Sequence, residues 1–139
     1  MNFPQSLNMQ IPSVFGEEKK VLQKMDELFS SFSFLEKDIQ EFKAAVAEAC
    51  INAIEHGNLE NKDLPILITI TLTEQMAACT VCDKGRGFPS IIQTDFNFDR
   101  GWGLKIIESF VDHWMIDKPL VDGFTFCISL EKRFNNLKG

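Results

Sequence analysis

The sequence is short of positive charge and of long apolar runs. It has 14 lysine and arginine residues against 20 aspartate and glutamate residues, which gives a net charge of −6 at pH 7. Because a nucleic-acid-binding surface needs a concentrated basic patch, this balance argues against direct contact with nucleic acid. No stretch approaches the run of about 18 apolar residues that spans a membrane, so we expect no membrane segment. The first residues, MNFPQSLNMQIP, also lack the basic start and apolar run of a signal peptide.

Cysteine is scarce as well, with four residues in the chain. Cys79 and Cys82 form a C-x-x-C, but both fall in a predicted strand over residues 76–82, where residues three apart point to opposite faces. No second pair of cysteine or histidine residues completes a zinc set. We therefore expect Cys50, Cys79, Cys82 and Cys127 to be reduced residues in or near the core, and the protein to be cytoplasmic.

The length and composition predict one globular domain over residues 1–139. Hydrophobic residues make up 45% of the chain, which is enough for a substantial core. Apolar periodicity predicts strands over 6–11, 66–72, 76–82, 114–117 and 124–130, helices over 15–31, 33–56 and 104–111, and a glycine-rich loop over 83–103. The order β-α-α-β-β-loop-α-β-β predicts an α/β two-layer sandwich, with a mostly antiparallel sheet and helices on one face.

The second predicted helix carries capping signals at both ends. Ser33 and Glu36 have the spacing of a capping box, in which the serine side chain caps the helix and the glutamate bonds back to it. Gly57 follows His56, at the position where a left-handed C-terminal cap is common. These signals predict a helix that begins just after residue 33 and ends at about residue 56.

The same helix carries a line of polar residues. Glu48, Asn52 and His56 are spaced at i, i+4 and i+8, so at about 100° per residue they fall along one face of the helix. Such a line is most often a solvent-exposed face. An acid and an amide one turn apart can also serve as a general base and as an oxygen ligand for Mg²⁺. Two later segments favour this second interpretation.

Both later segments are rich in glycine. Asp83-x-Gly85-x-Gly87 directly follows a predicted strand, and there a carboxylate can accept a hydrogen bond from an exocyclic amine such as that of adenine. Gly101-x-Gly103 opens a predicted helix, and free N–H groups at such a start can bind an anion. Each segment alone is also typical of an ordinary turn or loop-to-helix junction. The second one is not a P-loop, because no Gly-Lys-Ser/Thr follows.

Together, the three segments resemble the nucleotide-binding boxes of the ATPase superfamily of gyrase, heat-shock chaperones, histidine kinases and mismatch-repair proteins. They are most similar to the anti-sigma-factor serine/threonine kinases, a small bacterial branch. The resemblance covers about residues 5 to 131 and implies a Bergerat-type ATP-binding fold. It rests on three segments: Glu48-Ala-Cys-Ile-Asn52-Ala-Ile-Glu-His56-Gly57, Val81-Cys-Asp83-Lys-Gly85-Arg-Gly87-Phe88-Pro89, and Arg100-Gly101-Trp-Gly103-Leu104-Lys-Ile-Ile107 through Val111-Asp112.

This resemblance implies roles for the residues of the first two segments. Asn52 would coordinate Mg²⁺ through its side-chain oxygen. Glu48 would act as the general base, on a serine or threonine hydroxyl in a kinase or on water in a plain ATPase. Asp83 would accept a hydrogen bond from the adenine amine of ATP or ADP, and Gly85 and Gly87 would line the base pocket.

The third segment would bind the phosphates. By the same resemblance, Gly101 and Gly103 would cradle them at the helix start, next to Leu104. Arg100 would be either a charge partner of the terminal phosphate or a solvent-exposed lid residue, and both interpretations remain open. We expect His56 to stabilise the end of its helix rather than to take part in chemistry.

The implied function is that of an ATP-binding regulatory serine/threonine protein kinase of the anti-sigma-factor type. It would phosphorylate a small antagonist protein and sequester a sigma factor or another regulator by partner switching. A homodimer is expected by analogy alone. The alternative is a non-catalytic module that binds nucleotide and sequesters a partner. This alternative is favoured by the short segment over residues 88–100, which contains no lysine to meet the phosphates.

Overall fold

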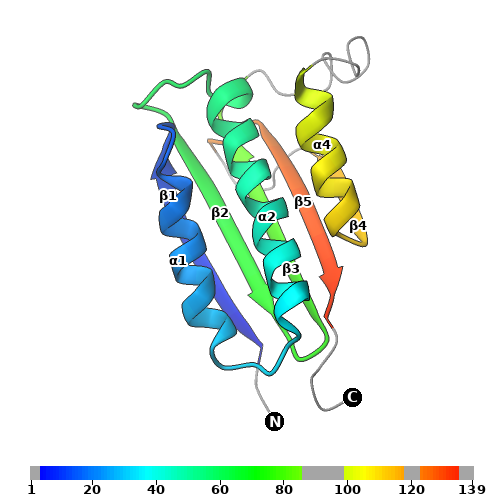
Figure 1. Cartoon of the computed structure of the whole chain (residues 1–139). Coiled ribbons are helices and arrows are strands. Elements are labelled where there is room, and N and C mark those ends of the chain that lie inside the picture. The colour runs from blue at the N-terminus through cyan, green and yellow to red at the C-terminus, as the bar shows by residue number, and fades with distance from the viewer. Residues whose placement is uncertain (1–3, 86–98, 118–122, 135–139) are drawn as a thin grey trace.

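A computed structural model describes residues 4–85, 99–117 and 123–134. Within these residues, five strands form one sheet in the order β1-β2-β3-β5-β4, in which every neighbouring pair is antiparallel. The helices cover one face of this sheet (Figure 1). The predicted α/β two-layer sandwich is therefore confirmed. The elements are β1 (Gln5–Pro12), α1 (Glu18–Phe29), α2 (Glu36–Asn52), the π-helix η1 (Ala53–Gly57), β2 (Pro65–Leu72), β3 (Met76–Asp83), α4 (Asp99–Phe110), β4 (His113–Asp117) and β5 (Phe126–Arg133).

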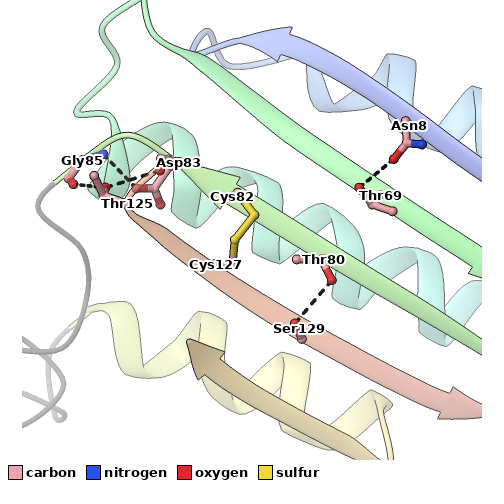
Figure 2. The surroundings of a disulfide bond; sticks show 9 residues. All are labelled: Asn8, Thr69, Thr80, Cys82, Asp83, Gly85, Thr125, Cys127 and Ser129. Atoms are coloured by element: carbon pink, nitrogen blue, oxygen red, sulfur yellow. Dashed lines mark hydrogen bonds between the residues drawn. A yellow bond between two sulfur atoms is a disulfide. The ribbon is translucent and has the colours of Figure 1, made fainter. Parts of the chain in front are cut away.

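The strands form a half-buried sheet because their side chains alternate between two faces. In β2 every second residue is buried and the others are partly exposed. The buried ones, Ile66, Ile68, Ile70 and Leu72, have no exposed surface and face the helix layer. On the opposite face polar side chains pair across strands, as Asn8 does with Thr69 and Thr80 with Ser129 (Figure 2).

Helix α2 lies between α1 and α4 across the middle of the sheet (Figure 1). Phe42, Val46 and Cys50 recur at intervals of four residues and are fully buried, so this apolar stripe holds the helix against the strands. The phenylalanine-rich segments around residue 30 also contribute to the core. Phe29 and Phe34 are buried and pack against the ring of Phe134, at centroid distances of 5.5 and 4.6 Å.

The predicted capping box at the start of α2 is wrong. The residue before the helix is Leu35, in an extended conformation, and it makes no side-chain cap hydrogen bond. Phe34 explains the difference, because its ring is drawn into the aromatic cluster and keeps the chain extended to residue 35. The helix therefore begins at Glu36 and not just after Ser33.

The end of the same helix also differs from the prediction. The α-helix is followed directly by the π-helix η1, and the backbone of Gly57 is not left-handed. The residues after it with left-handed backbones are Leu59 and Glu60, with φ of 54° and 56°. Helix α4 begins at Asp99, earlier than the predicted start at residue 104. The rest of the predicted loop, residues 86–98, lies outside the described residues.

The cysteines are not all reduced. Cys82 and Cys127 form a disulfide between directly opposed positions of β3 and β5, with a Cα–Cα distance of 4.1 Å (Figure 2). Cys50 and Cys79 are free and buried, as predicted. Cys79 and Cys82 do face opposite sides of their strand, but the partner of Cys82 comes from a distant segment. The expectation of a cytoplasmic protein rested on four reduced cysteines and loses that support.

Among the helices that the structure describes, none is both long enough and apolar enough to cross a membrane.

Candidate functional site

The first two predicted segments meet at one end of the sheet. Gly57, at the end of η1, lies against both Asp83 and Gly85, which follow from the end of β3. A Cβ atom on Gly85 would overlap the carbonyl oxygen of Gly57 and lie 3.1 Å from its Cα. A Cβ on Gly57 would collide with the Asp83 carboxylate, with Oδ1 only 2.9 Å away. Gly85 lies against the backbone of Gly57, and Gly57 lies against the side chain of Asp83, so glycine serves a packing purpose at both positions and not that of a helix cap.

Asn58 fixes this meeting point. Its side chain is 2% exposed and its Oδ1 accepts a hydrogen bond of 2.8 Å from the backbone N–H of Lys84. Its Nδ2 donates to Ser13 Oγ at 2.9 Å and to the carbonyl oxygen of Pro65 at 3.1 Å. One buried amide therefore joins the loops after β1, η1 and β3 to the start of β2.

Asp83 is buried, with 2% exposure, at the end of β3. Its Oδ1 accepts a hydrogen bond of 2.9 Å from the backbone N–H of Gly85, which orients the carboxylate within its own turn. Its carbonyl oxygen accepts a hydrogen bond of 2.9 Å from the backbone N–H of Thr125. The Thr125 hydroxyl also donates to the carbonyl oxygen of Gly85, so the residue that precedes β5 holds the turn as well (Figure 2).

Asn52 and Asp83 converge on one small cavity between α2 and the sheet. It has a volume of about 10 Å³, and its lining residues are Ala49, Asn52, Ala53, Val81, Asp83, Phe126 and Ile128. Asn52 is 7% exposed, and its Nδ2 has no hydrogen-bond partner among the described residues. A buried polar atom without a partner is costly in a folded protein. The position therefore suits a side chain whose partner comes with a ligand.

Glu48 lies one helical turn before Asn52 and is partly buried. Burial raises the pKa of its carboxyl above the ordinary value, and the negative charge of Glu55 raises this pKa further. His56 lies beside Glu55, with 3.4 Å between His56 Nε2 and Glu55 Oε1. The structural role expected of His56 stays a prediction.

The remaining predicted residues belong to the third segment, apart from Gly87, which lies outside the described residues. Arg100, Gly101 and Gly103 lie in the first turns of α4, whose start is at the same end of the sheet as η1 (Figure 1). In an α-helix the first four N–H groups have no intrahelical partner. Gly101 is among these four and Gly103 is not. Leu104 is 2% exposed and belongs to the hydrophobic core cluster.

Sequence reasoning missed Thr125 and gave Asn58 no role. Thr125 has no local motif, and it reaches the site only because β5 lies beside β3 in the sheet. Asn58 directly follows His56 and Gly57, and this position next to the first segment could have indicated a role for it.

Two larger hollows, of about 370 and 510 Å³, lie at the opposite end of β3, around Met76 and Arg133. Asp112, at the end of the third segment, lines the smaller of these two, but among the described lining residues neither contains one of those predicted to bind nucleotide. The small cavity is therefore the better candidate, because it is the one that brings the predicted polar side chains together.

Comparisons with known proteins agree with this arrangement. The model of the histidine kinase-like ATPase domain matches residues 16–124. The anti-sigma F factors of Bacillus velezensis and Bacillus subtilis are 33% and 32% identical to the chain over 109 residues, which is 73% of this chain and 73% of each relative.

Two solved structures share the fold. The crystal structure of the RsbU and RsbW domains of a Mycobacterium tuberculosis protein matches with a TM-score of 0.68 and 20% identity, over 94% of this chain and 32% of that chain. The mycobacterial sensor histidine kinase MprB matches with a TM-score of 0.55 and 14% identity, over 96% of this chain and 100% of that chain. The chain therefore belongs to the histidine kinase-like ATPase domain family and, within it, to the branch that contains the anti-sigma F factors.

Proposed function

We propose that this chain is a regulatory serine/threonine protein kinase that binds ATP or ADP with Mg²⁺ beside the small cavity that Asn52 and Asp83 line, at this end of the sheet. It transfers the γ-phosphate to a small antagonist protein and sequesters a sigma factor or another regulator. The observation that carries this proposal is the convergence of Asn52 and Asp83 on one cavity, beside the contact of Gly57 with Gly85. The partners are proposed from the similarity to anti-sigma F factors.

The residues present fit a nucleotide with its metal ion. The Asn52 amide is buried, and its Nδ2, which lacks a partner among the described residues, is a donor for a phosphate oxygen. Its Oδ1 is a neutral oxygen ligand of the kind that Mg²⁺ accepts. When bound, Mg²⁺ neutralises charge that develops on the phosphates. In the described part of the chain, no three histidine, cysteine, aspartate or glutamate residues gather into a metal site. Asn52 would therefore hold the ion together with phosphate oxygens and water rather than within an all-protein cage.

The other side chains have separate tasks in this proposal. The Asp83 carboxylate, oriented by the Gly85 N–H, accepts a hydrogen bond from the adenine amine. Glu48 takes the proton of the incoming serine or threonine hydroxyl, and its raised pKa makes it a stronger base than an ordinary glutamate. The N–H groups at the start of α4, including that of Gly101, would bind phosphate oxygens.

Replacing Asp83 with asparagine tests nucleotide binding. The variant Asp83→Asn loses a charged acceptor, and such hydrogen bonds contribute about 1.5–3 kcal/mol, so affinity for Mg-ADP should fall about tenfold to a hundredfold. Titration calorimetry measures this directly. A thermal shift offers a second check, since ligand at 100 times its dissociation constant stabilises the native state by about 2.7 kcal/mol. The control variant Asp26→Asn removes the same charge from an exposed side chain of α1 and should bind Mg-ADP normally. Equal affinity in the two variants would contradict the role of Asp83.

The pH profile of phosphoryl transfer tests whether Glu48 is the general base. Glu48 must be deprotonated to act, so the rate should rise with pH through its raised pKa. Because the charge of Glu55 contributes to that shift, Glu55→Gln should move the rise to lower pH. The same shift means that this carboxyl's contribution to stability is present below its unfolded pKa and lost as pH rises through the folded one. Glu108→Gln, on the exposed side of α4, should leave the profile in place. A profile that Glu55→Gln does not move would count against Glu48 as the base.

The second candidate function is a module that binds nucleotide and sequesters a partner without phosphoryl transfer. The lysine-free segment over residues 88–100 favours it. It predicts nucleotide affinity that depends on Asp83, with no label on any antagonist incubated with Mg-ATP. Labelling of an antagonist encoded beside this chain would exclude it.

A further inference from the structure

The disulfide lies next to the proposed nucleotide site along both strands that carry it. Cys82 directly precedes Asp83 in β3, and Cys127 directly follows Phe126 in β5. Asp83 and Phe126 line the cavity with Asn52, on the helix side of the sheet. The two sulfur atoms lie on the other side of the sheet, one residue away (Figure 2). A change in the cysteine pair therefore acts on both strands at the point where they line the cavity.

Non-covalent contacts also join the two strands beyond this point, among them Lys84 Nζ over the Phe124 ring at 5.2 Å. The ladder between β3 and β5 ends with Asp83 opposite Phe126. Past it, the described contacts between the strand ends include the Thr125 N–H on the Asp83 carbonyl, at 2.9 Å, and the Thr125 hydroxyl on the Gly85 carbonyl. These are neutral hydrogen bonds, each contributing about 1 kcal/mol. The covalent cross-link thus acts together with these contacts to fix the Asp83 turn relative to Thr125 and Phe126.

Reduction must disturb this geometry. Two thiols cannot stay at bonding distance, and their sulfur atoms have to separate to van der Waals contact. Both cysteines are only 4% exposed, and their Cα atoms are 4.1 Å apart, so neighbouring atoms have to move to make room. The displacement begins one residue from Asp83.

Thiol–disulfide exchange is expected at Cys82 and Cys127 and not at the other two cysteines. Cys50 and Cys79 are fully buried; burial raises the pKa of the Cys50 thiol to about 12 and the pKa of Cys79 well above its ordinary value. Because the thiolate is the reactive form, both stay inert at neutral pH. Thiol–disulfide chemistry in the folded protein therefore has one defined product.

We propose that the Cys82–Cys127 pair is a redox-controlled latch, with the disulfide form binding adenine nucleotide more tightly than the dithiol form. This inference rests on the proposed nucleotide site. Allosteric coupling is commonly 5- to 150-fold, and we expect about tenfold here, since the strand ladder persists in both forms.

The chemical step is a two-electron exchange with a dithiol reductant. A thiolate of the reductant attacks one protein sulfur, the protein S–S bond breaks, and the other protein sulfur leaves as a thiolate that takes up a proton. The second thiolate of the reductant then displaces the first protein sulfur, which is protonated in turn, and the reductant leaves as a disulfide. A low-molecular-weight disulfide as oxidant reverses both steps.

The test compares nucleotide affinity in the two redox forms of the full chain. One sample is oxidised with glutathione disulfide and one is reduced with dithiothreitol, and alkylation followed by mass measurement counts the thiols. Calorimetry with Mg-ADP should show about tenfold tighter binding by the oxidised form. The double variant Cys82→Ser with Cys127→Ser should match the reduced form in both buffers. Cys79→Ala keeps the pair and should keep the redox response.

Linkage supplies an independent readout. A tenfold preference of Mg-ADP for the disulfide form lowers the midpoint potential of the pair by about 30 mV when nucleotide is saturating. Equal affinities in both forms, or no disulfide in the oxidised folded protein, would overturn the latch and leave the proposed function standing. If neither redox form bound Mg-ADP, both the proposed function and the latch would be overturned.

Discussion

Glu48→Gln is expected to slow phosphoryl transfer about 10²- to 10⁴-fold, the range typical for loss of a general base. Glutamine keeps the size and partial burial of the side chain but cannot take a proton from the acceptor hydroxyl. Nucleotide affinity should change little, because in the proposal Asp83 contacts the adenine and Asn52 contacts the metal ion. The measurement is transfer of labelled phosphate from Mg-ATP to an antagonist encoded beside this chain, with calorimetry on the same samples.

A matched substitution on the same helix separates chemistry from folding. Glu36→Gln lies in the first turn of α2, on an exposed side chain whose described contact is with Gln40. It should transfer phosphate at the normal rate. If Glu48→Gln retained full activity, the proton would have to be taken by another group, and the proposed role of Glu48 would be wrong.

Gly85→Ala is expected to abolish nucleotide binding and to destabilise the fold. The added Cβ would overlap the Gly57 carbonyl oxygen, and both are backbone positions that no rotamer change can relieve. Overpacking of a tight contact costs about 1–3 kcal/mol, and here the displaced groups include the turn that orients Asp83. Chemical denaturation measures the stability, and calorimetry with Mg-ADP measures the binding.

Gly16→Ala is the control for this substitution. A Cβ at Gly16 would meet no atom within 4 Å, but its φ of +99° is unfavourable for alanine. The control should therefore cost about 1–2 kcal/mol through backbone strain and leave nucleotide binding intact. Similar loss of binding in both variants would show that general destabilisation, and not the contact of Gly57 with Gly85, is responsible.

The layers of the fold follow from short-range patterns in the sequence. Alternation in β2 and the four-residue spacing of Phe42, Val46 and Cys50 each depend on residues that are close in the chain, so both elements were predictable. The ends of α2 were not. Phe34 is placed by rings from other elements, and Gly57 is required by a turn after β3, and neither partner is visible in the local sequence.

The candidate site divides in the same way. Asn52 and Asp83 could be named because their segments resemble a known family, and the structure brings them to one cavity. Thr125 and the Cys82–Cys127 disulfide depend on the register between β3 and β5, in which residues 45 positions apart become direct neighbours. A sequence pattern that compares nearby residues finds Cys79 as the neighbour of Cys82, and it has no means of finding Cys127.

The buried amide of Asn58 has a consequence for the order of folding. Its partners come from the loop at Ser13, the strand start at Pro65 and the turn at Lys84, so three separate stretches of chain must be in place before they can all bond to it. Contacts between distant parts of a chain carry a large loop-closure cost and are completed late. Ligand affinity at this end of the molecule would then appear only once β1, β2 and β3 have come together, so it would report a late step of folding.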